Sequence, residues 1–311
     1  MKTKFFNDFS KFGPLIGLIL MMIVLSFLSD NFLTLDNIFN LLRQISINAL
    51  IAFGMTFVIL TAGIDLSVGS LLALGSALTA GMLTSGMDPM LAVLLGLLIG
   101  LGLGAINGLI ITKGKVAPFI ATLATMTIFR GATLVYTDGR PITGLSDSFA
   151  FQMIGGGYVF GIPFPVILMV IIFLVLMFIL QKTVFGRQVY AIGGNEEASI
   201  LSGIKADRVK IWVYALTGML SVLAGIILTS RLNSAQPTAG MMYELDAIAA
   251  VVIGGTSLMG GRGRIFGTLV GALIIGVIDN GLNLMNVSSF YQQIVKGGVI
   301  LLAVLLDRKS N

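Results

Sequence analysis

The chain has 311 residues, of which 56% are hydrophobic and only 11% are charged. A soluble domain carries roughly 25% charged residues, so a soluble core cannot hide this much apolar side chain and lipid must be the main solvent. The sequence has no cysteine and no histidine, which excludes disulfides, thiol nucleophiles, imidazole acid–base chemistry and the usual zinc ligands. The formal net charge of +5 is small, and we expect neither a metal site nor a nucleic-acid partner.

Ten apolar stretches are separated by polar breaks, and most approach the roughly 20 residues that a membrane-spanning helix needs. We therefore predict an all-α integral membrane protein of about ten transmembrane helices, organised as a single transmembrane domain over residues 1–311. The eighth stretch is short and rich in glycine, which makes it a candidate for a re-entrant segment. The predicted spans are residues 14–29, 45–62, 66–87, 91–112, 117–136, 163–181, 211–230, 245–260, 265–283 and 290–306.

The distribution of Lys and Arg predicts the orientation, since cytoplasmic loops of membrane proteins carry an excess of these residues. With the N-terminus inside, fourteen of the nineteen fall in cytoplasmic segments, three fall outside and two fall within spans. Lys2, Lys4 and Lys11 precede the first apolar run, and no small-residue cleavage site follows Leu28 and Ser29. We expect a retained first helix, an even number of spans and both termini in the cytoplasm.

A faint internal repeat relates the two halves of the chain. Residues 54–64 are similar to residues 218–226, and Asn-Gly-Leu at 107–109 recurs at 280–282. In the predicted topology the matching spans cross the membrane in opposite directions, which is the pattern of an inverted-topology repeat in transporters. Chance similarity among Gly, Ala and Leu is the alternative.

Within spans, small residues favour close packing. Gly96, Gly100, Gly104 and Gly108 recur every four residues of the fourth span. They form a smooth stripe that predicts a tightly packed neighbouring helix.

The longest cytoplasmic segment, residues 182–210, is predicted to contain a short polar helix. Asn195 is a good N-cap residue, and Glu196 and Glu197 would lie in the first turn, where the helix dipole favours negative charge. Gly203 would end the helix. On its own this pattern also fits a capped surface helix without a partner.

This segment carries a resemblance to a known family. Glu-Ala-Ser at 197–199, then three residues and Gly203, resembles the Glu-Ala-Ala-x-x-x-Gly motif of the permeases of ABC importers, with Ser199 in place of the usual second Ala. Four further stretches resemble motifs of the sugar permeases in the ribose, xylose and galactose importer group, and the resemblance runs from about residue 14 to the C-terminus. These stretches are residues 63–70, 193–196, 234–240 and 243–257.

The resemblance implies the fold of the vitamin-B12-type importer permeases, with two copies forming the pathway at their interface. It implies a separate ABC ATPase subunit, which holds ATP and magnesium, and an extracytoplasmic sugar-binding protein. The chain would bind no cofactor and would not be an enzyme, and it contains no Gly-x-x-x-x-Gly-Lys-Ser/Thr loop for ATP hydrolysis. It would lie among lipids of the bacterial cytoplasmic (inner) membrane and carry ribose, with another pentose or hexose as the alternative.

The resemblance also implies that the short polar helix docks on the ATPase and transmits its closure to the membrane helices. The residues that would make this coupling contact are Asn195, Glu196, Glu197, Ala198, Ser199 and Gly203.

Polar residues in or beside the predicted spans are candidates for a sugar path. Asp65 separates two apolar runs and is expected to cap a helix that begins at Leu66, with Ser67 close by. A tight hairpin at the cytoplasmic surface is the structural interpretation, and a broken helix that lines a translocation path is the functional one. The other candidates suit either a path or hydrogen bonds between helices; they are Asn48, Thr61, Asn107, Thr125, Asn280 and Asn283.

Three charges fall within the bundle: Arg130, Asp279 and Lys296. Asp279 and Lys296 are each about five or six residues from the outer ends of consecutive spans, so we expect them to lie at similar depth and to pair. An isolated charge at a helix centre costs roughly 2.5–3.5 kcal/mol on insertion scales. A structural ion pair is therefore favoured over a functional role.

Two other classes of protein are alternatives to an importer permease. An ion-coupled secondary transporter also fits ten helices and an inverted repeat, but it predicts a carboxylate or ion site near the midplane, for which Asp65 is the one candidate. A membrane-embedded enzyme lacks an evident catalytic set.

Overall fold

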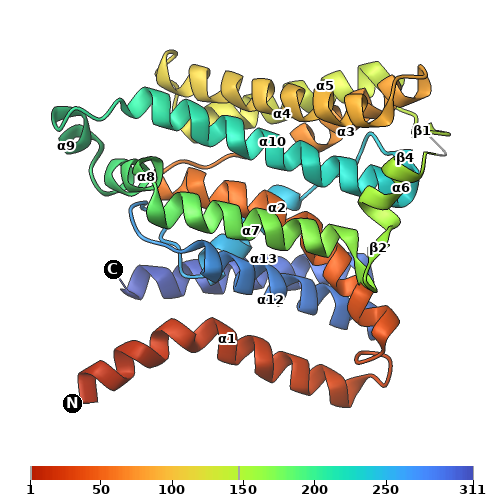
Figure 1. The fold of residues 1–311 in the computed structure, drawn as a ribbon. Helices are drawn as coiled ribbons and strands as arrows, with labels where there is room; N and C mark the ends of the chain where they lie inside the picture. The colour runs from red at the N-terminus through yellow and green to blue at the C-terminus, as the bar shows by residue number, and fades with distance from the viewer. Residues whose placement is uncertain (1, 146–147, 311) are drawn as a thin grey trace.

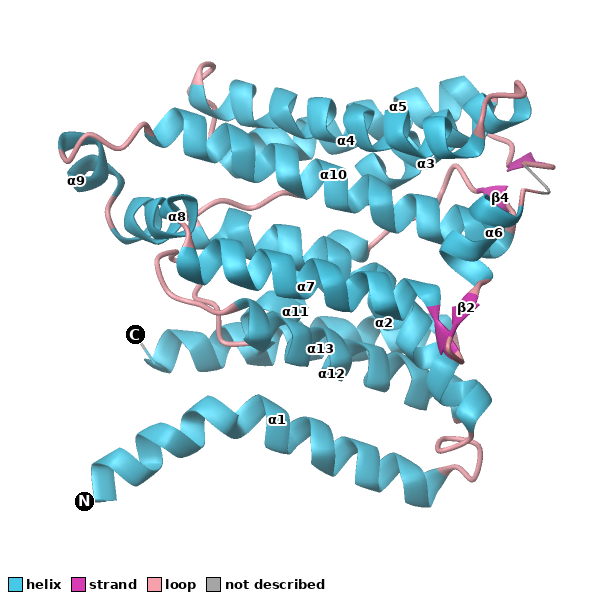
Figure 2. Ribbon diagram, in the orientation of Figure 1, coloured by secondary structure: helices cyan, strands magenta, loops and turns pink. Residues whose placement is uncertain are grey.

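The computed structural model describes residues 2–145 and 148–310 and is mostly helical within them (Figure 1). The helices, in chain order, are α1 (Lys2–Leu28), α2 (Leu35–Leu60), α3 (Val68–Thr84), α4 (Pro89–Thr112), α5 (Pro118–Thr137), α6 (Phe149–Gly156), α7 (Phe164–Lys182), α8 (Val184–Gly194), α9 (Glu196–Leu201), α10 (Ala206–Leu232), α11 (Tyr243–Ile253), α12 (Ile265–Leu284) and α13 (Ser289–Ser310). The strands of the described residues form two short antiparallel pairs, at the end of the bundle away from the chain termini (Figure 2). These pairs are β1 (Ile142–Thr143) with β4 (Ser234–Ala235) and β2 (Tyr158–Val159) with β3 (Ile162–Pro163).

In the described part of the chain, six helices are long and apolar enough to cross a membrane: α2, α4, α5, α7, α10 and α12. This finding supports the predicted all-α membrane protein. Each of the ten predicted spans coincides with a helix, but α3 and the apolar part of α1, Gly13–Leu28, are shorter than the six. The eighth span corresponds to α11, whose 11 residues rise only about 16 Å.

Some helices begin where apolarity does not predict them. α2 starts at Leu35, ten residues before the predicted span, because Thr34 caps it by accepting a hydrogen bond from the Asn37 backbone N–H at 3.4 Å. Its first turns are polar, so a window of apolar residues misses them. α6, α8 and α9 likewise lie in segments that were predicted to connect spans.

α2 and α10 form the centre of the bundle. Every residue from Ile45 to Leu60 of α2 is buried, which is the pattern of a helix enclosed on all sides by other helices. In Figure 1, α10 lies between α2 on one side and the layer of α4 and α5 on the other. α1 lies at the opposite edge of the bundle, beyond α12 (Figure 1).

The glycine stripe of α4 packs closely against neighbouring helices, as predicted, and most of it faces α10. A Cβ at Gly108 would lie 2.6 Å from the Ile211 Cα atom, and a Cβ at Gly104 would overlap the Tyr214 carbonyl oxygen. Contact at this range leaves no room for a side chain, so the prediction of close helix packing is confirmed.

The start of α1 and the end of α13 lie at the same end of the bundle as α8 and α9 (Figure 1). This arrangement agrees with the predicted orientation, in which both termini and the 182–210 segment share one side of the membrane. We name the two ends after that prediction: this one is the cytoplasmic end, and the opposite one is the outer end.

Candidate functional site

At the cytoplasmic end, helix α9 begins and ends as the sequence predicts. The Asn195 side chain accepts a hydrogen bond from the Ala198 backbone N–H at 2.9 Å and so caps the helix. Glu196 and Glu197 lie in the first turn. Gly203 follows the helix with a φ of +86°, a left-handed conformation that favours glycine.

The surface of α9 combines charge with exposed apolar side chains. Leu201 is 89% exposed and Ile200 is 53% exposed, whereas the Ser199 hydroxyl is turned inward and donates to the Asn195 carbonyl at 2.7 Å. Glu196 pairs with Lys210 of α10 at 2.6 Å, which ties the short helix to the start of a central one. Two exposed apolar side chains therefore lie beside the charged first turn of this six-residue helix.

Glycines join the end of α8 to two other segments. The Gly261 N–H donates to the Leu60 carbonyl, the last residue of α2, at 3.0 Å. A Cβ at Gly193 would overlap that same carbonyl, and a Cβ at Gly261 would lie 2.8 Å from the Gly194 nitrogen. Gly260 and Gly261 have φ values of +85° and +69°. We call this contact of Gly193, Gly194, Gly260 and Gly261 with the end of α2 the glycine junction.

Side chains reinforce this attachment of α8. The Tyr190 hydroxyl donates to the Gly263 carbonyl at 2.8 Å, and burial raises the pKa of Tyr190, so the phenol remains a neutral donor. The rings of Phe185 and Phe57 stack with centroids 6.3 Å apart. The unit formed by α8 and α9 is therefore attached both to α2 and to the segment that precedes α12.

Inside the bundle, the structure brings three of the path candidates together. One Asp65 carboxylate oxygen accepts hydrogen bonds from the Ser67 hydroxyl at 2.6 Å and from the Ser67 backbone N–H at 2.9 Å. The Asn107 amide donates to the Ser67 hydroxyl oxygen at 2.7 Å. The other Asp65 oxygen, the Asn107 amide oxygen and the Tyr214 hydroxyl are buried without a partner among the described residues.

The interpretation of Asp65 as part of a surface hairpin is wrong, because its side chain is completely buried. The expected cap at Leu66 is also wrong: α3 begins at Val68, with Ser67 in the N-cap position. The physical reason is that the Asp65 carboxylate bonds the backbone two residues ahead and forms a turn before the helix instead of capping it.

Arg130 has backbone partners rather than a carboxylate in an ion pair. Its guanidinium donates to the carbonyls of Pro237 at 2.7 Å and Ala239 at 2.8 Å, and more weakly to Gly69 at 3.4 Å. These bonds fix the segment between β4 and α11 against the first turn of α3. Arg130 therefore holds together parts of the chain that are far apart in sequence.

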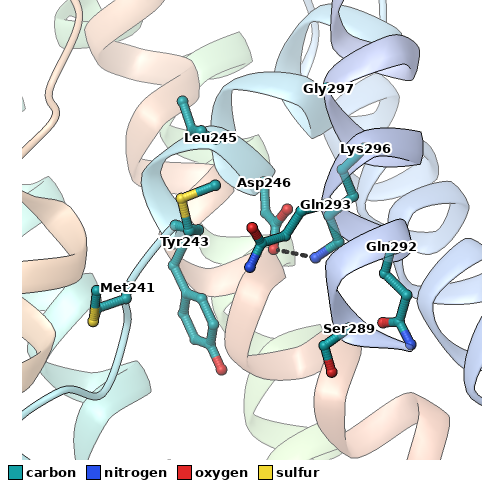
Figure 3. A pocket seen from close by; sticks show the side chains of 10 residues that line it. Met241, Tyr243, Leu245, Asp246, Ser289, Gln292, Gln293, Lys296 and Gly297 are labelled. Atoms are coloured by element: carbon teal, nitrogen blue, oxygen red, sulfur yellow. Dashed lines mark hydrogen bonds and ion pairs between the residues drawn. The ribbon is translucent and has the colours of Figure 1, made fainter.

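The predicted pairing of Asp279 with Lys296 is confirmed, at 2.9 Å. Asp246 of α11 is a third member, 3.0 Å from Lys296 (Figure 3). Sequence reasoning missed Asp246 because the residue was treated only as part of a family motif. Its position within a predicted span was the signal that would have found it.

The remaining path candidates form no hydrogen bonds with the cluster around Asp65 in the part of the chain that the structure describes. The Thr61 and Thr125 hydroxyls donate to carbonyls of their own turns, at 2.9 and 3.2 Å, and Asn48 is buried in α2. Asn280 and Asn37 exchange amide hydrogen bonds at 2.8 and 3.0 Å. The Asn283 oxygen accepts from Gln292 at 2.8 Å. A role for these residues in a sugar path stays a prediction.

Comparison with known proteins agrees with the resemblance found in the motifs. The chain is 68% identical over 301 residues to the ribose import permease protein RbsC of Bacillus subtilis (strain 168), covering 97% of this chain and 94% of that protein. It is 55% identical to the ribose import permease protein RbsC of Escherichia coli (strain K12), covering 96% and 93%. It is 45% identical to the D-allose transport system permease protein AlsC of the same strain, covering 96% and 91%.

No solved structure matches the chain. The family described as the branched-chain amino acid transport system / permease component matches residues 37–304. A match over this much of the chain confirms the resemblance to importer permeases. The chain therefore belongs to the family of branched-chain amino acid transport system permease components.

Proposed function

We propose that this chain is the membrane-spanning permease subunit of an ATP-driven ribose importer. The observation that carries the proposal is the 68% identity to the ribose import permease protein of Bacillus subtilis over 97% of the chain. Identity falls to 45% for the D-allose permease and to 37% for the xylose permease XylH of Escherichia coli. Ribose is therefore favoured over another pentose or hexose.

The proposal includes the finer features that the family resemblance implies. Residues 1–311 act as one permease domain with ten spans, an inverted repeat and the vitamin-B12-type importer fold. Two copies form the pathway in the bacterial inner membrane, surrounded by lipid. A binding protein delivers ribose from outside, and a separate ATPase holds ATP and magnesium, so the chain is a transport subunit and not an enzyme.

Coupling in this proposal runs through α9. The exposed side chains of Leu201 and Ile200 supply an apolar contact for the ATPase, and Glu197 supplies charge beside it. ATP has different affinities for the two states of the ATPase and so shifts the equilibrium between them. Movement of α9 passes through α8 and the glycine junction to α2 and to the segment before α12. The central helices then alternate between outward and inward access.

The experiment is ribose uptake into vesicles that contain the chain, its candidate ATPase and its binding protein. We expect uptake to require ATP and to fall at least tenfold in Leu201→Asp, since a charge replaces an exposed apolar contact. The ATPase should also no longer co-purify with this variant. Phe160→Asp is the matched control, because Phe160 is fully exposed at the other end of the bundle and should leave co-purification unchanged.

Uptake that continues without the ATPase, or that follows an ion gradient, would replace the proposal with an ion-coupled transporter. Attention would then turn to the buried Asp65 cluster. Equal co-purification of the ATPase with Leu201→Asp and Phe160→Asp would instead retain the importer and remove α9 as its coupling contact.

A further inference from the structure

A cavity of about 230 Å³ lies between the first turns of α11 and α13, toward the outer end of the bundle (Figure 3). A single water needs only roughly 10–15 Å³ of such space, so the cavity admits a small organic molecule. Its polar lining comes from Tyr243 and Asp246 of α11 and from Ser289, Gln292, Gln293 and Lys296 of α13.

Part of this lining is held in place before any ligand arrives. Asp246 and Lys296 are fixed by their ion pair, and Lys296 is held from its other side by Asp279. The Gln292 amide donates both to the Asn283 side chain at 2.8 Å and to the Val287 carbonyl at 2.9 Å. Its own carbonyl oxygen then remains available to a ligand. A polar site fixed by its own contacts loses little entropy on binding.

Other polar side chains at the cavity have no partner in the part of the chain that the structure describes. The Gln293 amide, the Ser289 hydroxyl and the Tyr243 hydroxyl form no hydrogen bond with the described residues. Figure 3 shows Gln293 and Lys296 directed from α13 toward Asp246, with the side chains of Tyr243 and Ser289 below them in this view. Donors and acceptors therefore meet around one space from two helices.

The chemistry of the lining selects among ligand classes. Asp246 and Lys296 are the charged residues of the lining and they form an ion pair, so the lining carries no net charge to hold an anion such as a phosphate. A carboxylate accepts from hydroxyl groups, and ammonium and amide groups donate to them, so the set suits a neutral polyol. The Tyr243 ring and the neighbouring methionines offer apolar surface for the C–H face of a sugar ring.

We propose that this cavity is a transient monosaccharide site, in which Asp246, Gln293 and Tyr243 contact the sugar after it leaves the binding protein. The proposal rests on the proposed function, because it identifies the cargo with the imported ribose. Ser289 and Gln293 are exposed, so the site is open on one side and releases its ligand readily. Such a site suits brief contact with a sugar that is being transported, not tight retention of it.

The test compares Gln293→Leu and Tyr243→Leu with wild type in the complete vesicle system, at saturating ribose-loaded binding protein. We expect ribose uptake to fall about three- to tenfold in each, the loss that one or two neutral hydrogen bonds produce. ATP hydrolysis stimulated by the loaded binding protein should stay unchanged. Tyr291→Phe is the control on the same helix, since Tyr291 is exposed and does not line the cavity.

A second measurement separates this site from the proposed function. Saturation-transfer NMR with D-ribose and the nanodisc-embedded chain should show equal contact in wild type and Tyr291→Phe, and a clearly weaker signal in Gln293→Leu. Wild-type uptake that Gln293→Leu and Tyr243→Leu leave intact would overturn the site and keep the importer. Absence of ATP-dependent uptake in wild type would overturn the importer, and the NMR result alone would then decide the site. Crosslinking of a lipid headgroup in the cavity, without ribose contact, would also overturn it.

Discussion

Replacement of Lys296 by methionine tests whether the three-residue ion network is buried. The Lys296 ammonium lies 3.0 Å from Asp246 and 2.9 Å from Asp279, and the exposed fractions of the three side chains are 23%, 5% and 6%. Lys296→Met leaves two enclosed carboxylates without a counter-charge. Removal of one partner from a buried pair costs about 3–5 kcal/mol.

That free energy converts into a shift of the unfolding temperature. A protein of this size changes by about 2 °C per kcal/mol, so we expect a decrease of roughly 6–10 °C. The assay is thermal unfolding of the detergent-solubilised chain, followed by intrinsic fluorescence. Adding Asp246→Asn and Asp279→Asn to Lys296→Met should recover most of the loss, because no unpaired charge then remains.

Lys113→Met is the matched control. Lys113 pairs with Asp207 at 2.7 Å, but the side chains are 65% and 48% exposed, and exposed pairs contribute little to stability. Equal unfolding temperatures for Lys113→Met and Lys296→Met would refute the buried network. So would failure of the triple variant to recover.

Three further predictions address packing, tethering and capping. Gly104→Leu should destabilise the protein by the upper part of the roughly 1–3 kcal/mol range for overpacking, whereas Gly102→Leu should not, because a Cβ at Gly102 would meet nothing within 4 Å. Thermal unfolding compares the two variants, and an equal loss of stability would contradict the α4–α10 contact. Arg130→Met should speed hydrogen exchange across residues 234–240, because two charge-assisted bonds worth about 1.5–3 kcal/mol each are lost; unchanged exchange would show that the segment is held by other contacts. Asn195→Ala should speed exchange of the α9 amides about fivefold, as expected for a lost cap of about 1 kcal/mol; unchanged rates would mean that the cap does not hold the helix.

Sequence reasoning succeeded where the determinants are local or periodic. The four-residue spacing of the α4 glycines predicted a packed face without knowledge of the partner, and Asn195 and Gly203 marked the limits of α9. The pairing of Asp279 with Lys296 followed from counting residues back from the ends of consecutive spans. In each case neighbouring residues along one or two helices contain the necessary information.

The sequence was less informative where a partner comes from a distant segment. Arg130 bonds carbonyls about a hundred residues away, and any residue has a carbonyl, so no side chain in the sequence identifies the acceptor. The sequence predicts a surface position for Asp65 because an acidic residue in a short polar break usually faces water. Its burial depends on α4 and α10 closing over it, which hydropathy along one segment does not encode. The hydrogen bond between Asn280 and Asn37 could not be predicted either, because the two residues are 243 positions apart and meet only through the packing of their helices.

The glycine junction has a mechanical consequence. At an ordinary interface, side chains change rotamer and so absorb small movements of the backbone. At the glycine junction the backbones are in direct contact, and no side chain lies between them to adjust. We therefore expect a displacement of α8 to move the end of α2 as well. A methyl group added at Gly193 would overlap the Leu60 carbonyl oxygen and force α8 and α2 apart. Substitution of Gly193 should therefore alter the balance between conformations more than the amount of folded protein.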